Sequence, residues 1–171
     1  MLVAAVEEVL LQGCTFLDQM CDNLYTRPLD GPLSASLGTH YRHTLDHFLC
    51  LLEGMGTGLI NYDERRRDPR VETSVAYARQ LTEELRYEFR NLPTDLLQQD
   101  CRVVYSIGYE EDRPEAARSN LARETMFCVG HAIHHYAVLR LLCKGVGVQL
   151  PYEFGIAPST LKHQEARAVR G

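Results

Sequence analysis

The chain has 171 residues, of which 45% are hydrophobic and 24% are charged. This length suits one domain that buries a hydrophobic core without disulfide or metal staples. A net charge of -5 without a dominant basic face argues against a nucleic-acid partner. Because no segment approaches the roughly 20 consecutive apolar residues of a membrane span, we expect a soluble, cytoplasmic protein without a membrane partner.

The six cysteines are widely spaced and form no C-x-x-C pair. This spacing excludes zinc ribbons and thioredoxin-type dithiols. Most of the cysteines lie beside apolar residues at helical spacing. We therefore expect reduced, buried thiols that fill the core.

Four segments have apolar residues at steps of three and four, which is typical of amphipathic helices. In chain order they cover about 2–25, 37–54, 71–91 and 119–145. Proline and glycine residues separate the first two segments, and Ser34 or Ser36 is expected to cap the second.

The connections between these helices are long. Residues 56–69 form a polar loop of a length that is usually functional or mobile. Residues 101–107 have the composition of a strand, but one short strand cannot form a sheet, so we interpret them as an extended crossover.

The sequence therefore predicts an all-α fold, a four-helix bundle with long crossover connections. One domain is expected over 1–161, followed by a solvated tail over 162–171. An irregular α-domain with the same helices is the alternative.

Six of the seven histidines lie in two short segments of the second and fourth predicted helices. In the fourth, His131 and His135 are four residues apart and so lie on one face of the helix. That spacing allows two imidazoles to bind one ion, as in H-E-x-x-H metalloproteases. Ala132 replaces the glutamate base here, which argues against a metalloprotease.

A third ligand is expected from the second helix, where His40, His43 and His47 lie within about 60° of one another on a helical wheel. Three neutral imidazoles suit zinc, nickel, copper or ferrous iron and leave a coordination position open. We therefore predict one divalent transition metal, with zinc or nickel preferred. The wheel places His40 and His47 nearer the apolar face than His43.

Other metal and catalytic motifs are absent from the sequence. No histidine follows a glutamate by three residues, as carboxylate-bridged di-iron bundles require. The haem motif C-x-x-C-H, the G-x-S-x-G elbow and the phosphate-binding P-loop do not occur either.

Three stretches resemble the DinB-like superfamily of metal-binding four-helix bundles, which includes bacillithiol S-transferases. They are Ser36–Asp46, Ile60–Asp68 and Gly130–Tyr136, and Phe154–Leu161 is similar to an uncharacterised branch of the superfamily. The resemblance implies an H-x-x-x-H pair at His131 and His135 and favours His43 as the third ligand, with His40 and His47 as rivals.

The resemblance also implies an enzyme that transfers a low-molecular-weight thiol to a small-molecule substrate. In that reading His134 or Tyr136 is the proton partner, and the arginines Arg65, Arg66 and Arg67 attract an anionic thiol. The alternatives are a metal-dependent hydrolase and a non-enzymatic, metal-binding stress-response bundle. A homodimer is expected from the resemblance alone.

Two residues near these histidines, Asp46 and Cys128, are expected to have structural roles and not roles at the metal. Asp46 could hydrogen-bond a ligand imidazole, but a solvated helix carboxylate is the stronger expectation. Cys128, three residues before His131, is expected to pack in the core and not to ligate metal.

Overall fold

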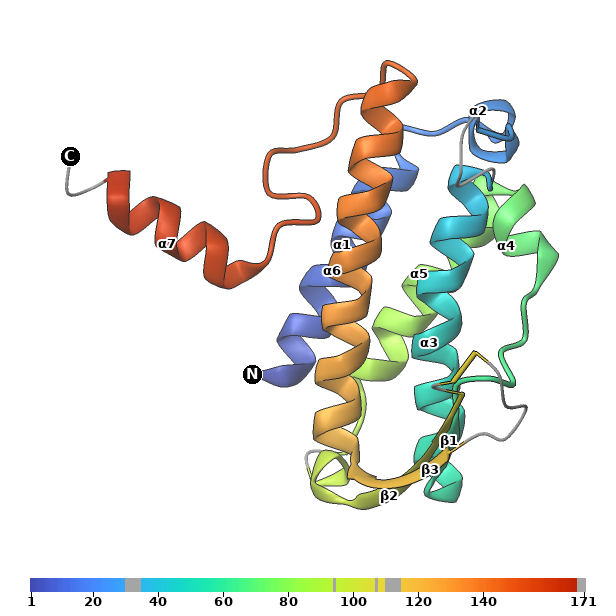
Figure 1. Ribbon diagram of the computed structural model, residues 1–171, viewed down its shortest axis with the longest axis vertical. Helices are drawn as coiled ribbons and strands as arrows, with labels where there is room; N and C mark the ends of the chain where they lie inside the picture. Colours follow the sequence, from blue (N-terminus) through green and yellow to red (C-terminus); the bar gives the residue numbers. More distant parts are fainter. Residues whose placement is uncertain (30–34, 94, 107, 110–114, 169–171) are drawn as a thin grey trace.

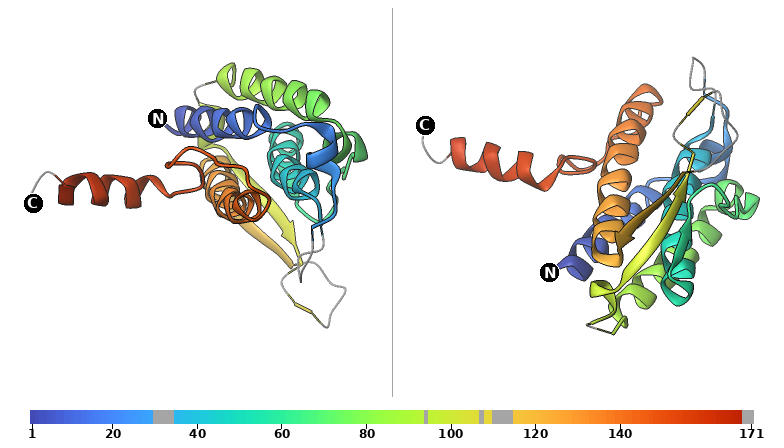
Figure 2. Two further views of the ribbon diagram at one scale, coloured as in Figure 1. Left: turned by 90° about the horizontal axis from the view of Figure 1, so that it is seen from above. Right: turned by 60° about the horizontal axis from the view of Figure 1, so that its bottom comes forward.

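The computed structural model describes residues 1–29, 35–93, 95–106, 108–109 and 115–168. Four long helices lie side by side (Figures 1 and 2), with α3 packed on α6 and α1 packed on α5. They are α1 (Leu2–Leu17), α3 (Leu37–Thr57), α5 (Val75–Arg90) and α6 (Leu121–Gly145). The shorter helices are α2 (Asp22–Thr26), α4 (Pro69–Thr73), the 3-10 helix η1 (Leu96–Gln98) and α7 (Pro158–Ala168).

A three-stranded mixed sheet crosses the lower ends of α3 and α6 (Figure 1). Its strands are β1 (Leu59–Asn61), β2 (Asp100–Tyr105) and β3 (Glu115–Asn120), in the order β1-β2-β3. β1 runs parallel to β2, and β2 runs antiparallel to β3. β1 follows α3 after one residue and β3 leads directly into α6, so the sheet links the ends of these two helices.

The all-α four-helix bundle predicted from the sequence is wrong, because the molecule combines helices with this sheet. The strand-like composition of residues 101–107 was a correct signal for β2, but its partners were missed. β1 has only three residues and lies in the predicted polar loop. β3 has the sequence EAARSN, which lacks the β-branched and aromatic residues that mark strands.

Two predicted helices are each divided in the structure. The first ends at Leu17 and is followed by the separate helix α2. The third is interrupted at Ser74, whose side chain accepts a hydrogen bond from the Tyr77 N–H and caps α5. The predicted cap of α3 is confirmed at Ser36, which accepts from the Thr39 N–H, whereas Ser34 lies outside the described residues.

Stacked aromatic rings form the centre of the core between α1, α3 and α6. The Tyr136 ring lies 6.3 Å from Tyr41 and 4.8 Å from Phe154, in both cases nearly parallel. All six cysteines are free, and five of them are buried as expected, while Cys21 is exposed.

The C-terminal segment forms the helix α7. α7 extends away from the body of the molecule (Figures 1 and 2) and buries none of its side chains. The predicted tail of residues 162–171 is therefore exposed but helical as far as Ala168, and 169–171 lie outside the described residues.

Among the described helices, α6 alone is long and apolar enough to cross a membrane, by length and composition only. It packs against α1 and α3 and carries the buried, ionisable Glu124.

Gly13 allows α1 to approach the aromatic core closely. A Cβ at this position would lie 2.6 Å from the Tyr136 hydroxyl oxygen and closer still to that of Tyr41. Both tyrosines are fully buried and cannot move aside. We therefore expect Gly13→Ala to lower the free energy of unfolding by about 1–3 kcal/mol in urea denaturation.

Gly56→Ala in α3 is the matched control, because an added Cβ there meets no atom within 4 Å. Alanine is the better helix former, so this variant should gain up to about 1 kcal/mol. Equal stability of the two variants would contradict the packing described for α1.

Candidate metal centre

The packing of α3 on α6 brings histidines from both helices together. His43 comes from α3, and His131 and His135 come from successive turns of α6. One ligand atom from each of the three lies within 4.8 Å of the others. The Nε2 atoms of His131 and His43 are 3.1 Å apart. This three-histidine group could hold a metal ion.

His47 lies beside this group without belonging to it. Its ring centroid is 4.0 Å from that of His131 and 4.7 Å from that of His43. Its Nδ1–H donates to the His43 carbonyl oxygen at 2.9 Å, so Nε2 carries the lone pair. The His47 side chain is buried.

His40, the other rival for the third ligand, lies farther out. Its ring centroid is 6.4 Å from that of His135, and it is not part of the three-histidine group. The helical wheel favoured His40 and His47 because it considered only the apolar residues of the helix itself. In the structure α3 contacts α6, α4 and α5, so the face that carries His43 is covered as well.

Burial keeps the clustered imidazoles neutral. It is the main cause that lowers the pKa of His43 to about 3, and those of His47, His131 and His135 to about 4. Positive charge on a neighbouring ring would lower the pKa of His43, His131 and His135 further. Each neutral ring therefore has one unprotonated nitrogen at neutral pH, which is the form that ligates metals.

The atoms of the site fit a transition metal. The Nδ1 atom of His135 and the Nε2 atom of His40 are buried and have no hydrogen-bond partner among the described residues. Leaving such an atom unpaired is costly, and coordination would remove that cost for His135. A donor set of imidazole nitrogens without carboxylates suits zinc, nickel or copper and not calcium or magnesium.

Two aromatic rings lie against the histidines. The Tyr62 ring is stacked on His47 at 5.4 Å between centroids, and the Phe127 ring is stacked on His131 at 5.7 Å. The Tyr62 hydroxyl donates to Glu124 at 3.1 Å, and this buried carboxylate also accepts from Arg123. These contacts fix the orientation of the two histidine rings from outside.

Sequence reasoning missed the roles of Tyr62, Phe127 and Glu124. A usable signal existed on α6, because Phe127 and Glu124 lie four and seven residues before His131, on the same side of the helix. Tyr62 follows β1 and had no such periodic signal.

The three arginines of the predicted cluster have different surroundings. The Arg65 guanidinium donates to the Tyr62 carbonyl, and its charge contributes to lowering the pKa of His43, His47 and His131. Arg66 instead pairs with Glu53, and Arg67 is exposed. Only Arg65 therefore lies near the histidines.

The remaining predicted residues lie apart from the three-histidine group or have other partners. His134 is exposed, with its ring 5.3 Å from that of His135. Tyr136 is fully buried in the aromatic core, so the structure does not bring it to the histidines.

Asp46 and Cys128 are both buried beside the site. Asp46 is 2% exposed and pairs with Arg42 at 2.8 Å, so it is neither a solvated carboxylate nor a partner of a ligand imidazole. Cys128 packs in the core as predicted, and burial raises the pKa of its thiol to about 12.

No protein-family model matches the chain. Over 105 residues, the chain is 30% identical to FK506-binding protein 5 of Rhizopus delemar. The match covers 61% of this chain but only 27% of that protein, so the matched part is about a quarter of the relative's length.

This similarity contradicts the function predicted from the sequence. The relative is named for binding FK506 and not for thiol transfer, hydrolysis or a stress response. The predicted thiol S-transferase-like enzyme is therefore wrong, as are its alternatives, a metal-dependent hydrolase and a stress-response bundle. The three-histidine group is an observation of geometry and does not depend on these activities.

Proposed function

We propose that the protein is a transition-metal-binding domain in which His43, His131 and His135 hold one divalent ion. The observation that carries this proposal is the convergence of three neutral imidazoles, from two helices, with ligand atoms within 4.8 Å of one another. Zinc and nickel are the preferred ions, because both accept sets of imidazole ligands.

The spacing of the nitrogens supports this assignment. Bonds of about 2.0–2.1 Å in a tetrahedral zinc site place neighbouring nitrogens about 3.4 Å apart. The Nε2 atoms of His43 and His131 are already 3.1 Å apart. One ligand atom of His135 lies within 4.8 Å of those of the other two histidines.

The residues around the triad have supporting roles in this proposal. His47 donates to the backbone carbonyl of His43 and thereby supports the turn of α3 that carries this ligand. Phe127 and Tyr62 shield the rings from water. A three-imidazole site leaves a coordination position for water or a small ligand.

We also place the protein in the cytoplasm, where its six free thiols would stay reduced. A small-molecule ligand, a homodimer and membership of the DinB-like superfamily stay predictions from the sequence.

Metal content and affinity test the proposed site directly. Protein purified without a metal-affinity tag should bind about one Zn²⁺ or Ni²⁺ per chain, measured by elemental analysis and by competition with a chromophoric chelator. Removing a residue that supports a ligand typically lowers metal affinity about 10–100-fold. Removing a ligand itself should cost more. We therefore expect metal binding to weaken by at least about 100-fold in each of His43→Ala, His131→Ala and His135→Ala.

His163→Ala is the matched control, because this histidine is exposed on α7. Its metal affinity should equal that of the wild type. Stoichiometric binding that survives both His131→Ala and His135→Ala would overturn the proposed site.

The name of the relative supplies a second candidate function, the binding of FK506. One structural observation favours it, a cavity of about 430 Å³ that is lined largely by apolar and aromatic groups. Tyr62, Val103, Tyr105 and Phe127 contribute to its wall. Cavities of this kind accept apolar organic molecules.

Isothermal titration with FK506 tests this candidate. Because Tyr105 lines the cavity, Tyr105→Ala should weaken binding by about 10-fold, whereas Tyr152→Ala, an exposed tyrosine elsewhere, should not. Absence of heat change with the wild type would eliminate FK506 binding and leave the metal proposal intact.

A further inference from the structure

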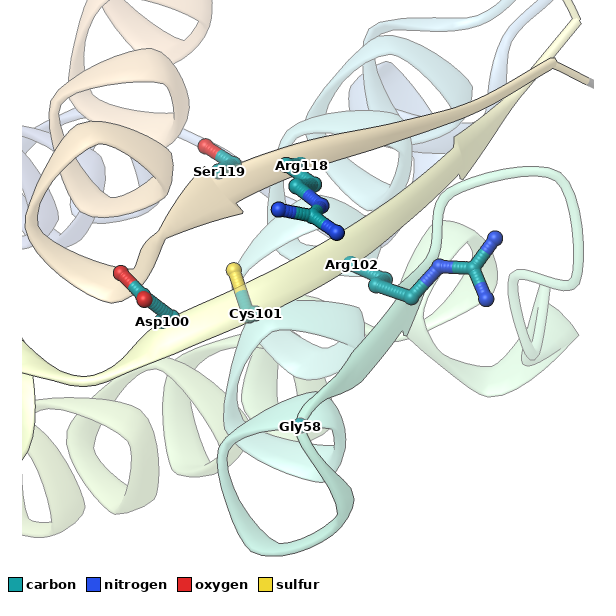
Figure 3. A pocket seen from close by; sticks show the side chains of 6 residues that line it. All are labelled: Gly58, Asp100, Cys101, Arg102, Arg118 and Ser119. Carbon is teal, nitrogen blue, oxygen red and sulfur yellow. The ribbon is translucent and has the colours of Figure 1, made fainter.

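A hollow of about 540 Å³ lies on the sheet, away from the histidines. Its lining residues are Gly58, Asp100, Cys101, Arg102, Arg118 and Ser119 (Figure 3). The volume is within the range of small-molecule sites. None of the histidines discussed above lines it.

Two arginines in this hollow are cross-strand neighbours in the β ladder. Arg102 of β2 and Arg118 of β3 are directly paired in the register of the antiparallel strands. Like charges at directly opposed positions destabilise a sheet. A neutral residue could occupy either position, yet the sequence has a repulsive pair of arginines there.

These two arginines also lack the partners that other arginines have. Among the side chains that the structure describes, no carboxylate oxygen lies within 4.0 Å of either guanidinium. Seven other arginines do pair with a carboxylate: Arg42, Arg66, Arg70, Arg79, Arg86, Arg90 and Arg123. Among the described side chains, neither arginine of the hollow is therefore neutralised by a direct ion pair.

The two guanidiniums occupy one side of the hollow. The Arg118 guanidinium lies between β3 and β2, whereas the Arg102 guanidinium extends past β2 towards β1 (Figure 3). Asp100 lies at the opposite end, near the start of β2 (Figure 3). The hollow therefore has a positive end with two planar donor groups and a negative end with one acceptor group.

We propose that this hollow binds a small organic phosphate, with the phosphate at Arg102 and Arg118 and a hydrogen-bond donor of the ligand at Asp100. A tetrahedral dianion offers oxygens in several directions, so two guanidiniums on neighbouring strands can each donate to it. A carboxylate, which is satisfied by one bidentate arginine, uses the pair less well. Binding of the dianion also removes the repulsion between the two strands.

Isothermal titration with O-phosphorylethanolamine tests the proposal. Metal-free protein is used, so that phosphate cannot bind through an ion at the histidines. Because each lost charge-assisted contact is expected to cost roughly 10-fold, Arg102→Gln and Arg118→Gln should each raise the Kd by at least about that factor. Inorganic phosphate should compete with the probe, and acetate should compete at least about 10-fold less well.

Arg167→Gln is the matched control, because it removes one positive charge from the exposed helix α7. Its Kd should equal that of the wild type. Equal weakening in all three variants would overturn the site and assign binding to net charge. Absence of binding to the wild type would also overturn it.

The melting temperature without phosphate provides a second measurement. A misfolded variant would have a lower melting temperature, whereas loss of the repulsion should raise it. Removing the repulsion should raise the melting temperature of Arg102→Gln or Arg118→Gln by about 1–3 °C relative to the wild type. Added phosphate should then raise the melting temperature of the wild type more than that of either variant. A lower melting temperature of both variants without phosphate would contradict the repulsive pair.

Discussion

The contact between α3 and α6 is the constraint on which the candidate metal centre depends. It places the Nε2 atoms of His43 and His131 3.1 Å apart, a distance that two charged imidazolium rings could not keep without strong repulsion. Burial lowers the pKa of both rings, so they are neutral at physiological pH and the helices can approach. The condition that allows this packing is also the condition for metal ligation, since only the neutral ring offers a lone pair. Folding and ligand chemistry therefore require the same protonation state.

The small sheet fixes how these two helices are aligned along their axes. α3 ends at Thr57, and the left-handed backbone conformation of the next residue, Gly58, turns the chain into β1. β3 passes into α6 without an intervening loop, with Asn120 as the helix cap. Pairing of both strands with β2 therefore sets the position of one helix relative to the other. The same turn delivers Tyr62 to the face of His47, so the sheet shapes the surroundings of the histidines as well as their register.

Periodicity in the sequence located most of α3 and α6, the Ser36 cap and the spacing of His131 and His135. It did not reveal the sheet, because β3 is polar and all three strands are paired through main-chain hydrogen bonds that leave little trace in composition. The helical wheel pointed away from His43, because it could not include the elements that cover α3 on several sides. The function could not be derived either, since the same three imidazoles serve many chemistries and the similarity to an FK506-binding protein contradicts the thiol chemistry expected from the resemblance.

X-ray absorption at the zinc edge tests the central claim, that imidazoles of α3 and α6 together hold one ion. For protein loaded with one equivalent of Zn²⁺, the account predicts three imidazole nitrogens at about 2.0–2.1 Å. His43→Ala should reduce this number to two, because the other two ligands are on α6. A sulfur scatterer at about 2.3 Å would contradict the account, since it would assign the ion to a cysteine. An unchanged imidazole count in His43→Ala would contradict it as well.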